Sequence, residues 1–143
     1  MNHVGLCVSD LERSRRFYVE LFGFEVDGEI RPPDDPTASL LGLEPPLGLR
    51  AVYLRRDSFR LELLAYEGRA ARPPRERPLD EPGLTHLSIG AGDHRALLGR
   101  VEALGGELVR ERDIGVAAFI RDPDGQLIEV LPATWGAPSL AEG

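Results

Sequence analysis

Two histidines and two glutamates stand at matching positions of a sequence that repeats itself. The segment that starts at His3 aligns without a gap with the segment that starts at His86. In the same way, Glu62 in FRLELLAY aligns with Glu129 in QLIEVLP. Imidazole nitrogens and carboxylate oxygens form a mixed donor set that suits Zn, Ni, Co, Mn or Fe. The repeat therefore predicts one divalent metal ion, held by one histidine and one glutamate from each half of the chain.

Each of these glutamates lies between apolar neighbours in a segment that alternates like a β-strand. Burying a carboxylate without a partner is costly, and a metal ion would compensate for that cost. Taken alone, any one of the four residues has a simpler interpretation as an ordinary polar side chain on a solvent-facing strand. The recurrence of the whole set in both halves is what favours metal binding.

The repeated segments predict the same order of elements in each half, β-α-β-β-β. We expect amphipathic helices at 10–22 and 93–104, first strands at 2–8 and 84–90, and later strands at 49–56, 59–66, 116–122 and 126–132. Each helix must bury an apolar stripe, and a four-stranded sheet offers a face for it. The predicted fold is α+β, with two tandem βαβββ modules that form an incomplete barrel, or cup, around the metal site.

The first half also carries an insertion at 31–48, whose prolines and glycines indicate a loop. A second irregular stretch at 67–83, rich in proline and arginine, indicates a solvated connector. We therefore expect one domain over residues 1–143. It would contain a first module at 1–66, the connector at 67–83, a second module at 84–132 and a tail at 133–143.

The composition excludes several kinds of chemistry. The 17 basic and 24 acidic side chains give a net charge of −7, which disfavours binding to nucleic acid. No apolar run approaches the roughly 18 residues that span a bilayer, and the first residues lack a signal-peptide pattern, so we expect a cytoplasmic protein. The single cysteine excludes an intrachain disulfide and a thiolate metal cluster. The absence of lysine excludes Schiff-base catalysis.

Four further residues are candidate contacts to a small-molecule substrate. Cys7 and Ser88 lie on the same strand faces as the two histidines, where small side chains leave space. The alternative for Cys7 is simple packing. Arg50 and Arg121 lie in β-like segments beside the expected cup and would hold an anionic group of the substrate. The alternative for both arginines is a position facing water.

The chain resembles the vicinal oxygen chelate superfamily, which includes glyoxalase I, methylmalonyl-CoA epimerase, extradiol dioxygenases, and the bleomycin and fosfomycin resistance proteins. The resemblance covers residues 2–132 and rests on NHVGLCVSDLERSRRFYVELFGFEV, RLELL, LTHLSIGAGD and AAFIRDPDGQLIEVL. It implies paired βαβββ modules around a metal-binding cup. Carried over by position, it implies metal ligands at His3, Glu62, His86 and Glu129, a set most similar to that of glyoxalase I.

This resemblance implies a divalent-metal-dependent lyase or isomerase of the glyoxalase I type. A proton would move next to a metal-bound carbonyl through an enediolate, on a small oxygen-chelating substrate such as a 2-oxoaldehyde–thiol adduct. Either Glu129 or Glu62 would be the catalytic base, and the sequence leaves both open. The resemblance also implies a homodimer, in which His3 and Glu62 of one chain could meet His86 and Glu129 of another.

Three other functions stay open for the same sequence. One is an Fe(II) ring-cleaving dioxygenase of the extradiol type, with Glu62 outside the ligand set. Another is an enzyme similar to methylmalonyl-CoA epimerase. The third is a non-catalytic protein that binds a small molecule or an antibiotic, although such a protein has no need to bury two carboxylates.

Overall fold

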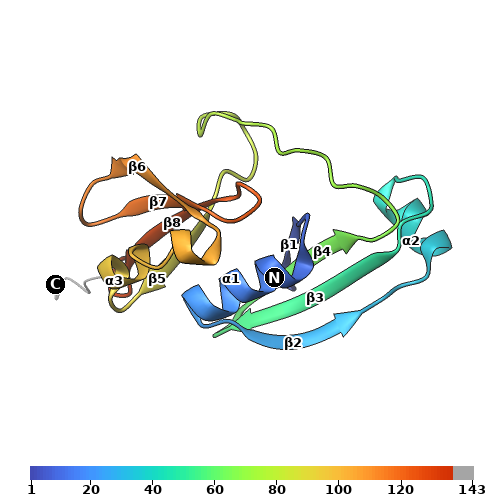
Figure 1. Ribbon diagram of the computed structural model, residues 1–143, viewed down its shortest axis with the longest axis horizontal. Coiled ribbons are helices and arrows are strands. Elements are labelled where there is room, and N and C mark those ends of the chain that lie inside the picture. Colours follow the sequence, from blue (N-terminus) through green and yellow to red (C-terminus); the bar gives the residue numbers. More distant parts are fainter. Residues whose placement is uncertain (137–143) are drawn as a thin grey trace, which may run out of the picture. The chain divides into compact units, whose positions relative to one another are not determined.

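The computed structural model describes residues 1–136 of the 143-residue chain, so the end of the expected tail, 137–143, lies outside the described residues. Contacts divide the chain into two units, one formed by residues 1–76 and one that begins at residue 77. Each unit contains one four-stranded mixed sheet with helical segments beside it (Figure 1). Among the described residues, no helix is both long enough and apolar enough to cross a membrane.

The first unit begins with the expected strand, helix and strand and then departs from expectation. Its elements are β1 (Val4–Cys7), α1 (Leu11–Phe22), β2 (Glu25–Ile30), α2 (Asp34–Leu41), β3 (Leu49–Arg56) and β4 (Phe59–Tyr66). The strand order in the sheet is β1-β4-β3-β2. Strand β1 runs parallel to β4, and the other neighbours are antiparallel.

The second unit repeats this arrangement. Its elements are β5 (Leu87–Ala91), α3 (His94–Leu98), a 3₁₀ turn (Glu102–Leu104), β6 (Glu107–Asp113), β7 (Ala118–Arg121) and β8 (Leu127–Pro132). The strand order β5-β8-β7-β6 places each strand where its counterpart lies in the first sheet. The predicted α+β fold with two βαβββ modules is therefore confirmed, and the residues described form no closed barrel.

Local signals at both ends explain the position of α1. Asp10 caps the first turn, because its side chain accepts a hydrogen bond from the amide of Arg13 at 3.0 Å. Gly23 ends the helix at a φ of 73°, a left-handed conformation that glycine adopts without a steric penalty. Phe17 and Tyr18 are fully buried on the helix face that packs against β3 and β4.

Two predictions about helices were wrong. The expected helix at 93–104 is interrupted after Leu98, because Gly99 has no side chain to bury and costs about 1 kcal/mol relative to alanine within a helix. The expected loop at 31–48 contains helix α2. Its signals were present in the sequence, with Pro33 before the first turn, acidic residues inside it, and Gly42 at the end with a φ of 64°.

The insertion is fastened to the first sheet by both polar and apolar contacts. The carboxylate of Asp34 accepts hydrogen bonds from the amides of Leu47 at 2.9 Å and Gly48 at 3.1 Å. Ala38 and Leu47 form a buried cluster with Leu49 of β3. Partly buried side chains that pack against this cluster are Leu43, Leu64 and Tyr66. Helix α2 therefore lies over the end of the sheet face that carries Leu64 and Tyr66.

Both first strands are shorter than predicted. Strand β1 begins at Val4 and β5 at Leu87, so each of the two histidines immediately precedes its strand. Before β5, the guanidinium of Arg77 donates hydrogen bonds to three backbone carbonyls, those of Glu81, Pro82 and Leu84, at 2.6–2.8 Å. No residue of the expected connector at 67–83 is buried, and within it the Arg77 side chain organises the residues that lead to His86.

Candidate metal centre

The first histidine–glutamate pair lies within the first unit. His3 precedes β1, and Glu62 is paired in the neighbouring strand with Gly5. His3 Nε2 lies 3.0 Å from Glu62 Oε2, and the Glu62 side chain is 12% exposed. On the other side of the ring, His3 Nδ1 lies 2.7 Å from the side-chain oxygen of Asn2. The imidazole is thus held at one nitrogen and presents the other to the carboxylate.

A tyrosine completes the surroundings of this pair. Tyr53 of β3 is the antiparallel partner of Glu62 and donates a hydrogen bond to it. This hydrogen bond, followed by burial, raises the pKa of the Tyr53 phenol above its usual range. The Tyr53 ring meets the His3 ring edge-on at 5.6 Å between centroids. The guanidinium of Arg60 lies 4.1 Å over the same ring and forms an ion pair with Asp27 at 2.9 Å.

The second histidine–glutamate pair lies within the second unit and is built from the corresponding strands. His86 Nε2 lies 3.5 Å from Glu129 Oε2, and the Glu129 side chain is 28% exposed. The hydroxyl of Ser88 donates a hydrogen bond of 2.8 Å to the same oxygen. The other ring nitrogen, His86 Nδ1, lies 2.8 Å from the hydroxyl of Thr85. Phe119 is the antiparallel partner of Glu129, and its ring makes a T-shaped contact with the His86 ring at 5.2 Å between centroids.

Both pairs have spacings that suit two neighbouring ligands of one ion. Two donors that each lie about 2.1 Å from an ion are about 3.0 Å apart at a right angle and about 3.4 Å apart at the tetrahedral angle. The observed separations are 3.0 Å for His3 and Glu62 and 3.5 Å for His86 and Glu129. The shorter separation also suits a direct hydrogen bond. The donor types and their spacing therefore fit a divalent metal ion.

Each unit contributes two of these donors. Over residues 1–136, no three side chains of histidine, cysteine, aspartate or glutamate form a group that could hold a metal ion. Structural and catalytic metal sites usually use three or four protein ligands. Each pair alone therefore supplies fewer ligands than such a site usually has.

The other predicted site residues are distributed over both sheets. Cys7 is exposed and shares a face with Gly5 and Glu62. Ser88 contacts Glu129 directly, and Arg121 lies on the same face as Glu129, where its guanidinium donates to the carbonyl of Gly125 at 3.2 Å.

Arg50 lies on the opposite face of the first sheet from Glu62, since it is paired with Ala65. Its guanidinium forms ion pairs with Glu29 at 2.9 Å and with Glu12 of α1 at 3.5 Å. The hydrogen bond with Glu29 raises the pKa of Arg50 and lowers that of Glu29. The structure thus brings Arg50 together with carboxylates beside α1 rather than with the first pair.

Sequence reasoning missed the groups that surround the pairs. Asn2 and Thr85 each directly precede a histidine, so the repeat that aligned His3 with His86 also aligns these two residues. Tyr53 becomes visible only from strand register: β3 and β4 are paired from Arg56 and Phe59 onward, and this register places Tyr53 opposite Glu62. A comparison of Tyr53 with Phe119, once the strands are aligned, would have found it.

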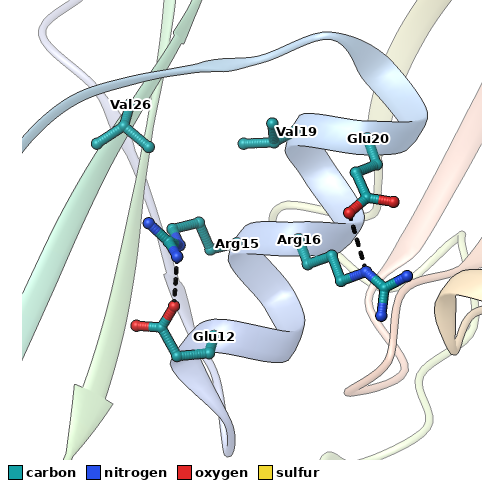
Figure 2. A pocket seen from close by; sticks show the side chains of 6 residues that line it. All are labelled: Glu12, Arg15, Arg16, Val19, Glu20 and Val26. Carbon is teal, nitrogen blue, oxygen red and sulfur yellow. Dashed lines mark hydrogen bonds and ion pairs between the residues drawn. The ribbon is translucent and has the colours of Figure 1, made fainter.

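A separate hollow of about 460 Å³ lies on the outer side of α1 and carries no comparable chemistry. Its charged lining groups are matched within the helix (Figure 2). Arg15 forms an ion pair with Glu12 at 2.6 Å, and Arg16 forms one with Glu20 at 2.9 Å. Val19 and Val26 supply the rest of the lining. Paired charges on an open surface contribute little, so the two histidine–glutamate pairs are the stronger candidates for chemistry.

Comparisons with known proteins agree with the observed fold. Among solved structures, the trypanothione-dependent glyoxalase I of Leishmania major is 28% identical and has a TM-score of 0.71, with 94% of this chain and 86% of that chain covered. A glyoxalase family protein of Enterococcus faecalis is 26% identical, with a TM-score of 0.61 and coverage of 91% and 94%. A fosfomycin resistance protein of Listeria monocytogenes, 17% identical with a TM-score of 0.61 and coverage of 92% and 89%, shares the fold.

No curated protein sequence matches the chain. The model of one protein family matches residues 1–130, which is most of the chain. The chain belongs to the Glyoxalase/Bleomycin resistance protein/Dioxygenase superfamily.

Proposed function

We propose that this protein is a divalent-metal-dependent lyase or isomerase of the glyoxalase I type. The observation that carries the proposal is the duplicated pair, His3 with Glu62 and His86 with Glu129, at donor spacings of 3.0 and 3.5 Å. Many members of the superfamily are metalloenzymes, and a glyoxalase I is among the similar solved structures. The substrate class is a small molecule with neighbouring oxygens, such as a 2-oxoaldehyde–thiol adduct.

Both pairs together would hold the ion through two nitrogens and two carboxylate oxygens, a set suited to Zn, Ni, Co, Mn or Fe. When bound, such an ion acts as a Lewis acid that polarises a carbonyl and makes the neighbouring C–H bond more acidic. The side chains of Asn2 and Thr85 orient the two imidazoles, as outer partners of metal-binding histidines do.

Of the two glutamates, we propose Glu129 as the base that moves the proton and Glu62 as the fixed ligand. A carboxylate that acts as a base needs one oxygen within reach of the substrate. Glu129 is more exposed than Glu62, and its contact with histidine is longer. In a hemithioacetal the carbon that bears sulfur loses its proton and the neighbouring carbonyl carbon gains one. The product is a 2-hydroxyacyl thioester, and no oxidant is required.

The test is turnover of 2-oxoaldehyde–thiol adducts by protein loaded separately with Ni, Co, Zn or Mn. We expect activity in the wild type and a loss of about 100-fold or more in kcat for Glu129→Gln. Glu107→Gln, at an exposed position of β6, is the matched control and should keep full activity. Full turnover in Glu129→Gln would exclude that residue as the base. Oxygen uptake with a catechol and iron-loaded protein, in place of isomerisation, would contradict the proposed reaction.

We also propose that the protein acts as a homodimer, as proteins of this superfamily commonly do. A mixture of two inactive variants tests how the pairs combine. One variant carries His3→Ala and Glu62→Ala, and the other carries His86→Ala and Glu129→Ala. Activity that returns on mixing means that a pair from one chain meets a pair from its partner. Activity that stays absent, in a protein that remains dimeric, means that both pairs act within one chain.

A further inference from the structure

The glutamates of the two histidine–glutamate pairs each have an aromatic cross-strand neighbour and a hydroxyl group that donates a hydrogen bond to them. The two pairs differ in the strand that supplies this hydroxyl group. In both sheets the glutamate lies between a residue of the parallel neighbour and a residue of the antiparallel neighbour. For Glu62 these residues are Gly5 and Tyr53, and for Glu129 they are Ser88 and Phe119. Each glutamate thus has one aromatic neighbour and one hydroxyl donor. The hydroxyl comes from β3 in the first unit and from β5 in the second.

We propose that Tyr53 and Ser88 are positioning residues, each of which holds the carboxylate of its own unit beside the histidine Nε2 through one hydroxyl hydrogen bond. This inference deepens the proposed function, because the same carboxylates are the proposed ligands. It assigns a role to two residues that do not touch the substrate's reacting atoms. It also predicts that a hydroxyl group from either neighbouring strand can hold the glutamate. In the first sheet the hydroxyl comes from the antiparallel neighbour, and in the second sheet it comes from the parallel neighbour.

The contacts around Tyr53 explain why its hydroxyl is well placed. Its ring makes a T-shaped contact with the His3 ring and a second contact with the guanidinium of Arg60, which Asp27 anchors in turn. A ring held by two contacts loses little further entropy when its hydroxyl binds Glu62. The bonded carboxylate also loses fewer alternative rotamers on metal binding, because its position is already restricted.

Ser88 acts at shorter range. Its hydroxyl donates to Glu129 Oε2, the same oxygen that lies 3.5 Å from His86 Nε2. The bond therefore fixes the atom that faces the histidine. Phe119 cannot replace it, since a phenyl ring has no donor. Without the Ser88 hydroxyl, the only described contact of the Glu129 carboxylate would be the one with His86 Nε2, at 3.5 Å.

The first sheet has room for a hydroxyl donor to Glu62 on β1, in the position that Ser88 has in the second sheet. A Cβ atom at Gly5 would lie 3.7 Å from Glu62 Oε2 and 3.3 Å from Leu64 Cδ1, the flexible end of a side chain. A serine at this position occupies the place that Ser88 has in the second sheet. The double variant Gly5→Ser with Tyr53→Phe thus moves the hydroxyl donor from β3 to β1 and keeps the aromatic ring.

The first experiment is a Co²⁺ titration of the full-length protein, followed by visible absorption. We expect Tyr53→Phe to weaken Co²⁺ binding about 10-fold or more, as loss of an outer-shell partner does. The double variant with Gly5→Ser should recover most of this loss. Tyr66→Phe is the matched control, since Tyr66 lies on the same face of β4 within the apolar cluster, and it should bind like the wild type. Unchanged affinity in Tyr53→Phe, or no recovery in the double variant, would overturn the inference.

The second experiment is independent of any metal. Urea unfolding of the metal-free protein is measured for Tyr53→Phe, Glu62→Ala and the variant with both changes. We expect the two effects to be non-additive, because either change alone breaks the same hydrogen bond. Additive effects would overturn the inference. A wild-type protein that binds no Co²⁺ but shows non-additive effects would contradict the proposed function and leave the positioning role of Tyr53 in place.

Discussion

A single buried carboxylate holds the turn that leads from β7 into β8, and its loss should have a large effect. Asp122 is only 4% exposed. One of its oxygens accepts hydrogen bonds from the amides of Asp124 at 2.9 Å and Gln126 at 2.8 Å. The amide of Asp122 also donates to the carbonyl of Gln126 at 2.9 Å. Because Glu129 follows directly in β8, this turn sets the register in which the second pair is presented.

The expected cost of Asp122→Ala follows from these bonds. The change leaves two partly buried amides without an acceptor, and an unsatisfied donor costs about 1–3 kcal/mol when buried. With partial burial taken into account, the total loss should be about 2–4 kcal/mol in free energy of unfolding. Asp122→Asn keeps one acceptor oxygen for the two amides and loses the charge and the second acceptor oxygen, so its cost should be about half as large.

Urea denaturation followed by circular dichroism and by the fluorescence of Trp135 measures this effect. For a protein of this size the free energy of unfolding falls by roughly 1–3 kcal/mol per molar urea. The urea midpoint of Asp122→Ala should therefore be about 1–2 M lower than that of the wild type. Asp80→Ala, at an exposed position of the connector, is the control and should leave the midpoint unchanged. A midpoint of Asp122→Ala equal to that of the control would refute the reasoning.

Three further predictions concern stability and local order. The hydrogen bond from Arg95 lowers the pKa of Asp113 below its usual 3.8, so its stabilisation exists above that pH and disappears as the pH falls through the folded-state pKa. Arg95→Ala should therefore lower the thermal midpoint by more at pH 7 than at pH 2.5, and an equal loss at both pH values would contradict this. Arg77→Ala should accelerate hydrogen exchange in residues 78–84, and Arg77→Lys should restore little of the protection, because an ammonium group lacks the forked geometry that reaches three carbonyls. Unchanged exchange would argue against this role. Leu47→Ala should cost about 2–4 kcal/mol because Leu47 is fully buried, whereas Leu40→Ala, at 84% exposure, should cost less than about 0.5 kcal/mol. Equal urea midpoints for these two variants would show that the cluster under α2 does not stabilise the fold.

The duplicated architecture was predictable because its signals are periodic and occur twice. Asp10 and Asp93 both cap helices, and each glutamate stands half-buried in its strand between two buried apolar neighbours. The predictions that were wrong concerned helices whose start or end depends on a single glycine or proline. Gly99 was enough to end α3 early, and the prolines at 32–36 concealed a helix start, since proline is tolerated in a first helical turn.

The histidines and glutamates of the candidate site were predictable from the sequence, but the residues that surround them were not. Matching positions in the repeat were sufficient to select His3, Glu62, His86 and Glu129. The role of Tyr53 depends on the cross-strand register of β3 with β4, which the alternation of residues along a single strand does not give. Arg50 has the residue type of an anion-binding group, but strand alternation directs it to the other face of the sheet, toward carboxylates beside α1.

Metal content per chain, measured by elemental analysis after reconstitution of the full-length protein, tests the central claim most directly. If both pairs hold one ion, the wild type takes up about one divalent ion per chain, and His3→Ala and His86→Ala each lose most of it. Equal loss in these two variants is the decisive result, because the two residues belong to different units. A wild-type protein that takes up no ion, or uptake that survives the removal of either histidine, would contradict the account.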